Sequence, residues 1–78
     1  MSRRYLDARR LLCPMPVIRV QDEVGKWAPG DELEVTCTDP GVVNDVPAWC
    51  RLNGHRVLDI AHNENNEIVI TIEIGPHG

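Results

Sequence analysis

Alternating apolar positions predict strands at four places along the chain. The clearest alternation lies in Glu67–Ile74, where isoleucines occupy every second position, and a two-residue period places all of them on one face of a strand. Glu32–Thr38 alternates in the same way, with Leu33, Val35 and Cys37 on the apolar face. Tyr5–Ala8 and His55–Ala61 are expected to be the other two strands. Cys37 is therefore predicted to be buried.

Apolar residues at three- and four-residue steps predict a helix from Pro14 to about Trp27. Such spacing puts them on one stripe of the helix, while the charged residues between them fall elsewhere on its circumference. The stripe consists of Val17, Val20, Val24 and Trp27. We expect it to face the core.

The segment after Asp39-Pro40-Gly41 predicts a second helix that Pro47 should prevent from being continuous, because proline breaks a helix interior. Val42–Asn44 would then form a turn, and a short helix would run from Val46 to about Leu52 with Asp45 as its N-cap. Pro47 would lie in the first turn of this helix, where proline is tolerated. The sequence does not decide whether Trp49 or Cys50 faces the core.

The order of these elements is β-α-β-α-β-β, and it predicts an α+β fold. Because one face of Glu32–Thr38 is polar, both helices should cover the other face, which gives a two-layer α/β sandwich with a four-stranded mixed sheet. Helical crossovers should leave the first three strands parallel, and the turn His62–Asn66 should make the last two antiparallel. The 78 residues are expected to form one domain, 1–78.

Composition excludes several classes of protein. The net charge of −4 argues against nucleic acid as a direct partner, and no segment is long and apolar enough to cross a membrane. Three cysteines without a Cys-x-x-Cys spacing make neither a disulfide framework nor a zinc site, so reduced thiols in the cytoplasm are expected. His55, His62 and His77 lack metal-site spacing and are expected to be scattered surface residues. No metal or cofactor is predicted.

Cys13 stands where an extended segment should give way to the first helix. Pro14 favours extended backbone at Cys13 and is itself tolerated at a first helical position, so Cys13 is predicted to be the N-cap, with the Met15 amide nearest its sulfur. The positive end of a helix favours a thiolate. The alternative is a small buried side chain that happens to precede a helix.

The charge distribution adds to the expectation of an anionic sulfur. Up to position 19 the chain has five arginines and one acid, whereas the remainder has three basic and eleven acidic residues. A sulfur near the arginines would be stabilised as a thiolate if they lie within a Debye length, about 8–10 Å. Cys13 is therefore predicted to be an exposed, reactive thiolate.

The order of motifs resembles the TusA (SirA-like) family of sulfur carriers. The resemblance rests on the Cys-Pro-x-Pro tetrad Cys13–Pro16, preceded by Leu6-Asp7-Ala8 and followed by Pro29-Gly30-Asp31, Asp39-Pro40, Asp45-Val46-Pro47 and Trp49-Cys50, and it spans about Leu6 to Ile74. It implies that Cys13 carries sulfur as a persulfide, with Pro14 and Pro16 completing the site. The family commonly has glycine where this chain has Arg10; if that position needs a positive φ, arginine is strained there.

The resemblance implies a cysteine desulfurase or a rhodanese-like protein as sulfur donor and a downstream relay protein as acceptor. Its known outlets are 2-thiouridine formation in tRNA, molybdenum-cofactor biosynthesis and sulfur oxidation. Residues around the sulfur that could contact such partners are Arg10, Leu12, Met15 and Arg19. For Leu12, packing beneath the helix is an equally good interpretation.

A sulfur carrier also asks less of the sequence than a stand-alone catalyst does. A cysteine hydrolase needs a base, an orienting group and oxyanion donors, and the sequence places none of them near Cys13. Sulfur transfer needs thiolate character, access and a docking surface. Two alternatives remain: a regulatory or protein-interaction module in which the tetrad only starts a helix, and a thiol redox protein that pairs Cys13 with Cys50 or Cys37.

Overall fold

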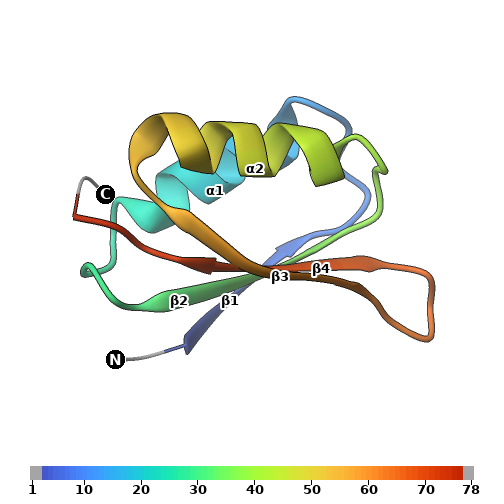
Figure 1. The fold of residues 1–78 in the computed structure, drawn as a ribbon. Coiled ribbons are helices and arrows are strands. Elements are labelled where there is room, and N and C mark those ends of the chain that lie inside the picture. Colours follow the sequence, from blue (N-terminus) through green and yellow to red (C-terminus); the bar gives the residue numbers. More distant parts are fainter. Residues whose placement is uncertain (1–2, 77–78) are drawn as a thin grey trace.

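The computed structural model describes residues 3–76, and His77 therefore lies outside the described residues. The elements follow the predicted order β-α-β-α-β-β (Figure 1). They are β1 (Arg3–Ala8), α1 (Met15–Val24), β2 (Glu32–Cys37), α2 (Val42–Asn53), β3 (Arg56–His62) and β4 (Ile68–Glu73).

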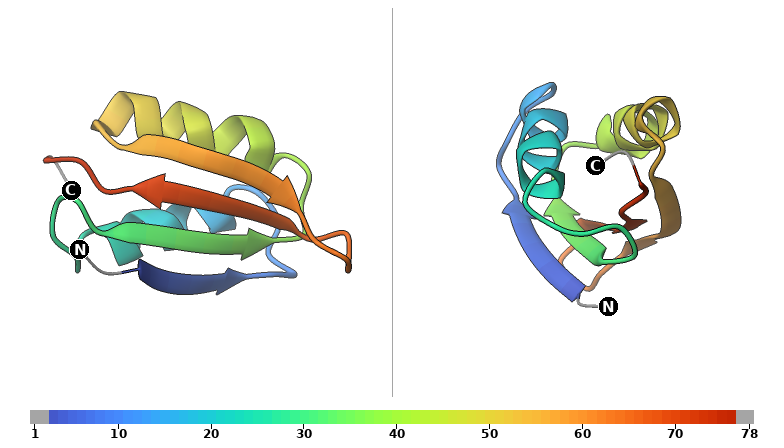
Figure 2. Two further views of the ribbon diagram at one scale, coloured as in Figure 1. Left: turned by 60° about the horizontal axis from the view of Figure 1, so that its bottom comes forward. Right: turned by 90° about the vertical axis from the view of Figure 1, so that its left-hand side faces the viewer.

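The four strands form one mixed sheet in the order β1-β2-β4-β3. β1 runs parallel to β2, and β4 runs antiparallel to both β2 and β3, so that the first three strands share one direction as predicted. Both helices lie on the same side of this sheet (Figures 1 and 2). The predicted two-layer α+β architecture is confirmed.

The core fills the space between the helices and the covered face of the sheet. Alternation places the inward residues of β2 opposite those of β4, with Leu33 beside Ile72, Val35 beside Ile70 and Cys37 beside Ile68. The buried apolar side chains are Ala8, Val20, Val24, Leu33, Val35, Cys37, Val42, Val46, Cys50, Ile68, Ile70, Ile72 and Ile74. Cys50, rather than Trp49, is the fully buried member of that pair.

The second helix is continuous, and the predicted split at Pro47 is wrong. α2 begins after Gly41 and passes through Pro47, which occupies an interior position. An interior proline costs about 3 kcal/mol, whereas burying an aliphatic side chain such as valine contributes roughly 1.5–3 kcal/mol. Val42, Val46 and Cys50 recur at four-residue steps and are all buried, so the continuous helix offsets the lost hydrogen bond.

The first helix is shorter than predicted at both ends. It ends at Val24, and Lys26 and Trp27 donate to Glu23 and Val24 in tighter i→i−3 bonds of 3.0 and 3.2 Å. Trp27 remains half-buried against the core, with the Arg4 guanidinium carbon 4.1 Å from its ring centroid. Trp27 therefore contacts the core as predicted, although it lies in a turn after the helix.

His55 is buried rather than exposed, which corrects the prediction of surface histidines. Its Nδ1 accepts a hydrogen bond from the Gly75 amide at 2.9 Å, and its ring stacks on Trp49 with centroids 5.1 Å apart. A side chain on Gly75 would collide with the Gly54 carbonyl, so glycine is needed for this close approach. His62 is exposed, as predicted.

None of the described helices has the length and apolar character that crossing a bilayer requires.

Candidate functional site

Cys13 lies at the end of the sheet where the first two strands stop. β1 and β2 are parallel neighbours, so the connection that leads to α1 and the one that leads to α2 leave the sheet side by side (Figure 1). The Arg10 amide donates to Thr38 Oγ1 at 2.9 Å and joins the two connections. This arrangement brings Cys13 to residues that lie far away in the sequence.

Two carboxylates hold Cys13. Its backbone amide donates to Asp39 Oδ2 at 2.9 Å, and its thiol donates to Asp45 Oδ2, with Sγ and the oxygen 2.6 Å apart. Asp39 comes from the connection between β2 and α2, and Asp45 from the first turn of α2. The exposed thiol therefore has a fixed direction.

The prediction that Cys13 is a stabilised thiolate is wrong, because its surroundings raise the pKa of the thiol. The hydrogen bond to Asp45 raises the pKa of the Cys13 thiol above its ordinary value of 9.0, and desolvation and the charges of Asp45 and Asp39 add to that increase. Three of the five arginines expected near the sulfur are engaged elsewhere: Arg9 pairs with Asp7 at 2.9 Å, Arg3 pairs with Glu32 at 2.7 Å, and Arg4 lies over the Trp27 ring. In the free protein the neutral thiol is favoured.

The helix start also differs from the prediction. The N-cap is Pro14, which follows a cis peptide bond from Cys13, and α1 begins at Met15. The Met15 amide donates to the Leu12 carbonyl at 2.9 Å rather than facing the sulfur. Pro16 is buried under the first turn. The prolines therefore shape the loop that presents Cys13, and Cys13 does not cap the helix.

Arg10 has φ 66°, in the left-handed region where glycine is preferred. The condition stated from the sequence, a positive φ at position 10, is therefore met in this chain, and arginine is strained there. Because the Arg10 amide is bonded to Thr38, the loop keeps this conformation in spite of the arginine side chain.

Apolar side chains around the thiol point into solvent. Leu12 is 77% exposed, so its packing beneath the helix is ruled out; the neighbouring Leu11 packs against the core instead. Met15 and Ile18 are each 41% exposed and lie one helical turn apart on α1. Arg10 and Arg19 are exposed as well. Ile18 was not singled out from the sequence, and the signal for it was its place one helical turn after Met15.

The other two cysteines are core residues, as predicted for Cys37 and left open for Cys50. Cys37 and Cys50 are buried, and burial raises the pKa of each thiol to about 11. Within residues 3–76 no group of three or more His, Cys, Asp or Glu side chains is arranged to hold a metal ion.

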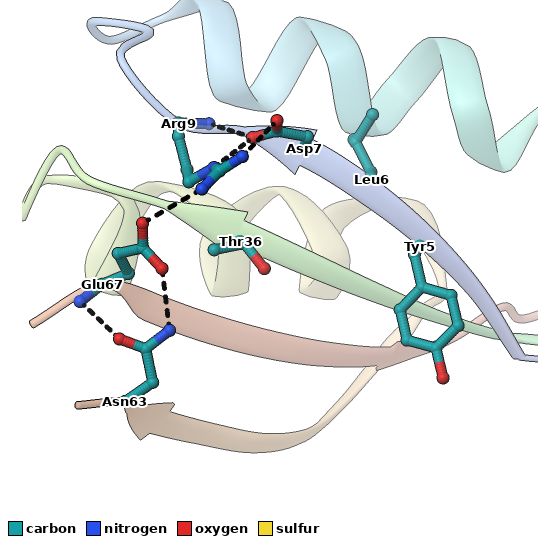
Figure 3. A pocket seen from close by; sticks show the side chains of 7 residues that line it. All are labelled: Tyr5, Leu6, Asp7, Arg9, Thr36, Asn63 and Glu67. Carbon is teal, nitrogen blue, oxygen red and sulfur yellow. Dashed lines mark hydrogen bonds and ion pairs between the residues drawn. The ribbon is translucent and has the colours of Figure 1, made fainter. Parts of the chain in front are cut away.

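A cavity of about 310 Å³ is lined by residues of β1, Arg9, Thr36 of β2 and residues next to the turn between β3 and β4, and Cys13 is not among them (Figure 3). Its charged side chains bind one another: the Arg9 guanidinium bridges Asp7 and Glu67, and the Asn63 amide donates to Glu67 at 2.8 Å. The hydrogen bonds from Arg9 lower the pKa of Asp7 to about 2. The network ties β1 to the turn between β3 and β4.

The contact of Asp39 and Asp45 with Cys13 was not predicted, and the sequence holds only an indirect signal for it. Both residues belong to the family motifs, Asp39-Pro40 and Asp45-Val46-Pro47, and Asp45 was expected only to cap a helix. Their presence in two motifs that flank a connection at the cysteine end of the sheet was the available signal. The carboxyl ends of parallel strands gather at one edge, which brings these acids to the thiol.

Comparison with known proteins confirms the family resemblance. The family model described as sulfurtransferase TusA matches residues 4–74. The chain is 41% identical over 58 residues to the Bacillus subtilis protein named "Putative sulfur carrier protein YrkI", covering 74% of this chain and 77% of that one. It is 41% identical over 54 residues to the sulfur carrier protein TusA of Pseudomonas aeruginosa PAO1, covering 69% of this chain and 68% of that one.

The fold comparison agrees with the predicted architecture. The crystal structure of a SirA-like protein from Desulfitobacterium hafniense superposes with a TM-score of 0.81, at 21% identity, and covers 96% of this chain and 99% of that one. At this identity the match shows the shared fold.

Proposed function

The chain belongs to the TusA family of sulfurtransferases, and from this premise we propose that it carries sulfur as a persulfide on Cys13. The predicted sulfur-carrier role agrees with the names of its relatives. What this chain's own residues add is the choice of the sulfur-bearing atom and of the surface that surrounds it.

The observation that carries the proposal is the difference among the three cysteines. All are free thiols, and Cys13 is exposed whereas Cys37 and Cys50 are buried. A donor protein must bring its own sulfur within bonding distance of the acceptor, so access is the first requirement of transfer. Cys13 meets this requirement, and its Sγ and backbone amide are both held by carboxylates.

The proposed transfer is a thiol exchange at the donor's persulfide. Sγ of Cys13, having lost its proton, attacks the outer sulfur of the donor; a bond from Sγ to that sulfur forms, and the donor's S–S bond breaks. The donor's inner sulfur leaves as a thiolate and takes up a proton. One sulfur atom has moved, and no external oxidant or reductant is consumed.

The proposed docking surface consists of Leu12, Met15 and Ile18, flanked by the exposed Arg10 and Arg19. Exposed aliphatic side chains beside a reactive atom favour protein partners, and methionine adapts to more than one partner surface. A carrier must meet a donor and an acceptor in turn. Pro14 and Pro16 support this surface by setting the start of α1.

Sulfur-relay partners are implied by membership of the family. We propose a cysteine desulfurase or a rhodanese-like protein as donor and a relay protein as acceptor, leading to tRNA 2-thiouridine, molybdenum cofactor or sulfur oxidation. The cytoplasm is the proposed location, because an accessible thiol that must accept sulfur repeatedly has to be kept reduced.

Incubation with a cysteine desulfurase and cysteine, followed by intact-mass measurement, tests the proposal. The protein should gain one sulfur atom that a reductant removes, and Cys13→Ser should gain none. Cys37→Ala and Cys50→Ala are matched controls at buried thiols and should load like the parent protein. An internal disulfide instead of added sulfur would favour a redox protein, and loading that persists in Cys13→Ser would refute the proposal.

A further inference from the structure

We propose that Asp45 is a positioning residue that keeps the proton on Cys13 Sγ while the carrier is free, so that the thiol becomes nucleophilic only when a partner disturbs this contact. The inference rests on the proposed function, because it concerns the same sulfur. Asp45 lies in the first turn of α2, and the proposal gives it a role in sulfur transfer through the proton on Cys13 Sγ.

The contact is built from well-anchored groups. The Asp45 amide donates to the Gly41 carbonyl at 3.1 Å within the start of α2, and the Asp45 Oδ2 accepts the thiol at 2.6 Å. On the other side, Asp39 Oδ2 accepts the Cys13 amide at 2.9 Å, while Oδ1 accepts the Gly41 amide at 3.2 Å. Gly41 thus links both acids, and Sγ is directed at a carboxylate held by a helix.

The charged groups around Sγ act in the same direction. Asp45 on α2 and Asp39 on the preceding connection are both acidic. On the loop before α1, the guanidinium of Arg9 is bonded to Asp7 and Glu67, and the charge of the exposed Arg10 acts on Asp7; the charges that act on the Cys13 thiol are those of Asp45 and Asp39. Among the residues that the structure describes, no basic side chain pairs with Asp39 or Asp45. A thiolate at this point would face two carboxylates, so the protonated form is favoured.

The consequence is a carrier whose exposed thiol is protected between partners. Oxidants and alkylating agents react with the thiolate, and a neutral thiol is a poor nucleophile. Transfer requires the proton to leave Sγ before the new S–S bond forms, and this proton balances the one that the departing donor thiolate takes up. A partner that displaces the Asp45 carboxylate from Sγ removes the interaction that holds the proton there.

The test is the rate of alkylation of Cys13 by iodoacetamide as a function of pH, followed by mass spectrometry on the full chain. In Asp45→Asn the midpoint should move to lower pH, because the hydrogen bond and the charge that favour the neutral thiol are removed, and the rate at neutral pH should rise several-fold. Asp59→Asn is the matched control: it removes the same charge from an exposed position on β3 and should follow the parent protein.

Two results would overturn the proposal. One is a parent protein whose Cys13 titrates at or below the ordinary value of 9.0, which is decisive even if Asp45→Asn does not fold. The other is a folded Asp45→Asn with an unchanged or higher midpoint. Alkylation does not depend on sulfur loading, so the two proposals can fail separately. A parent protein that fails to load sulfur would refute the proposed function. A parent protein that loads sulfur but gives either of these two alkylation results would refute only the role of Asp45.

Discussion

Cys13 shows how a single side chain can be exposed and yet restrained. Its sulfur is open to solvent, but two carboxylates from another part of the chain fix its amide and its thiol. Exposure, the loop shaped by two prolines and the tetrad could all be anticipated from local sequence. The carboxylates could not, because their proximity arises only when two connections leave neighbouring parallel strands.

The same limit explains the error about charge. The arginines are close to Cys13 along the chain, and that proximity suggested a thiolate. In the fold, Arg3 and Arg9 turn to the glutamates and aspartate of the sheet, and the acids Asp39 and Asp45 take the place beside the sulfur. A count of charges along a sequence cannot distinguish these two arrangements.

Arg10→Gly tests the strain at Arg10, which has a positive φ three residues before Cys13. A non-glycine residue in the left-handed region costs about 1–2 kcal/mol, and glycine loses roughly 0.5–1 kcal/mol more on folding, so the substitution should raise the free energy of unfolding by up to about 1 kcal/mol. Urea unfolding of both proteins measures this difference. A lower stability in Arg10→Gly would mean that the arginine side chain contributes contacts that exceed the strain.

At the scale of elements, periodicity predicted each strand to within two residues at either end, and the order of the elements was correct. The failure was α2, where a local rule about proline was allowed to divide a helix. Burial of Val42, Val46 and Cys50 depends on the tertiary neighbours of that helix, and those neighbours are absent from the local pattern. The sequence therefore indicated the cost of Pro47 to the helix, but not the burial of apolar side chains that offsets this cost.

Pro47→Ala measures that cost. Alanine restores an amide that can donate to the Val43 carbonyl, so the free energy of unfolding should rise by about 1 kcal/mol, less than the full penalty of an interior proline because the unfolded chain also gains freedom. Thermal and denaturant unfolding are the measurements. A loss of stability would show that the proline ring packs in a way that alanine cannot replace.

At the scale of the whole molecule, acidic side chains of the sheet form ion pairs with arginines near the N-terminus. Arg3 pairs with Glu32 and Glu34 on β2, and Arg9 pairs with Glu67 in the turn between β3 and β4. Such exposed pairs contribute little stability each, so the fold depends mainly on the isoleucine and valine core. Their effect is on charge distribution: these arginines are paired with other acids, and the charges that act on the Cys13 thiol are those of Asp45 and Asp39.

The buried thiols predict a loss of stability at alkaline pH. Burial raises the pKa of Cys37 and of Cys50 to about 11 from 9.0, so the folded state keeps protons that the unfolded chain releases. Their contribution is fully present below pH 9 and falls as the pH rises to 11, by about 2 kcal/mol for each thiol. Denaturant unfolding across this range should show the decline.

A double variant, Cys37→Ala with Cys50→Ala, supplies the control for this prediction. It should be less stable at neutral pH because it loses buried sulfur, but its stability should change less between pH 9 and 11. An equal slope in both proteins would assign the alkaline loss to other groups.

The most direct measurement of the central claim is the position of the sulfur in the loaded carrier. The parent protein is loaded by a cysteine desulfurase, its persulfide is trapped by alkylation, and the peptides are sequenced by mass spectrometry. We predict that the additional sulfur lies on Cys13 alone. Additional sulfur on Cys37 or Cys50, with Cys13 unmodified, would contradict the account.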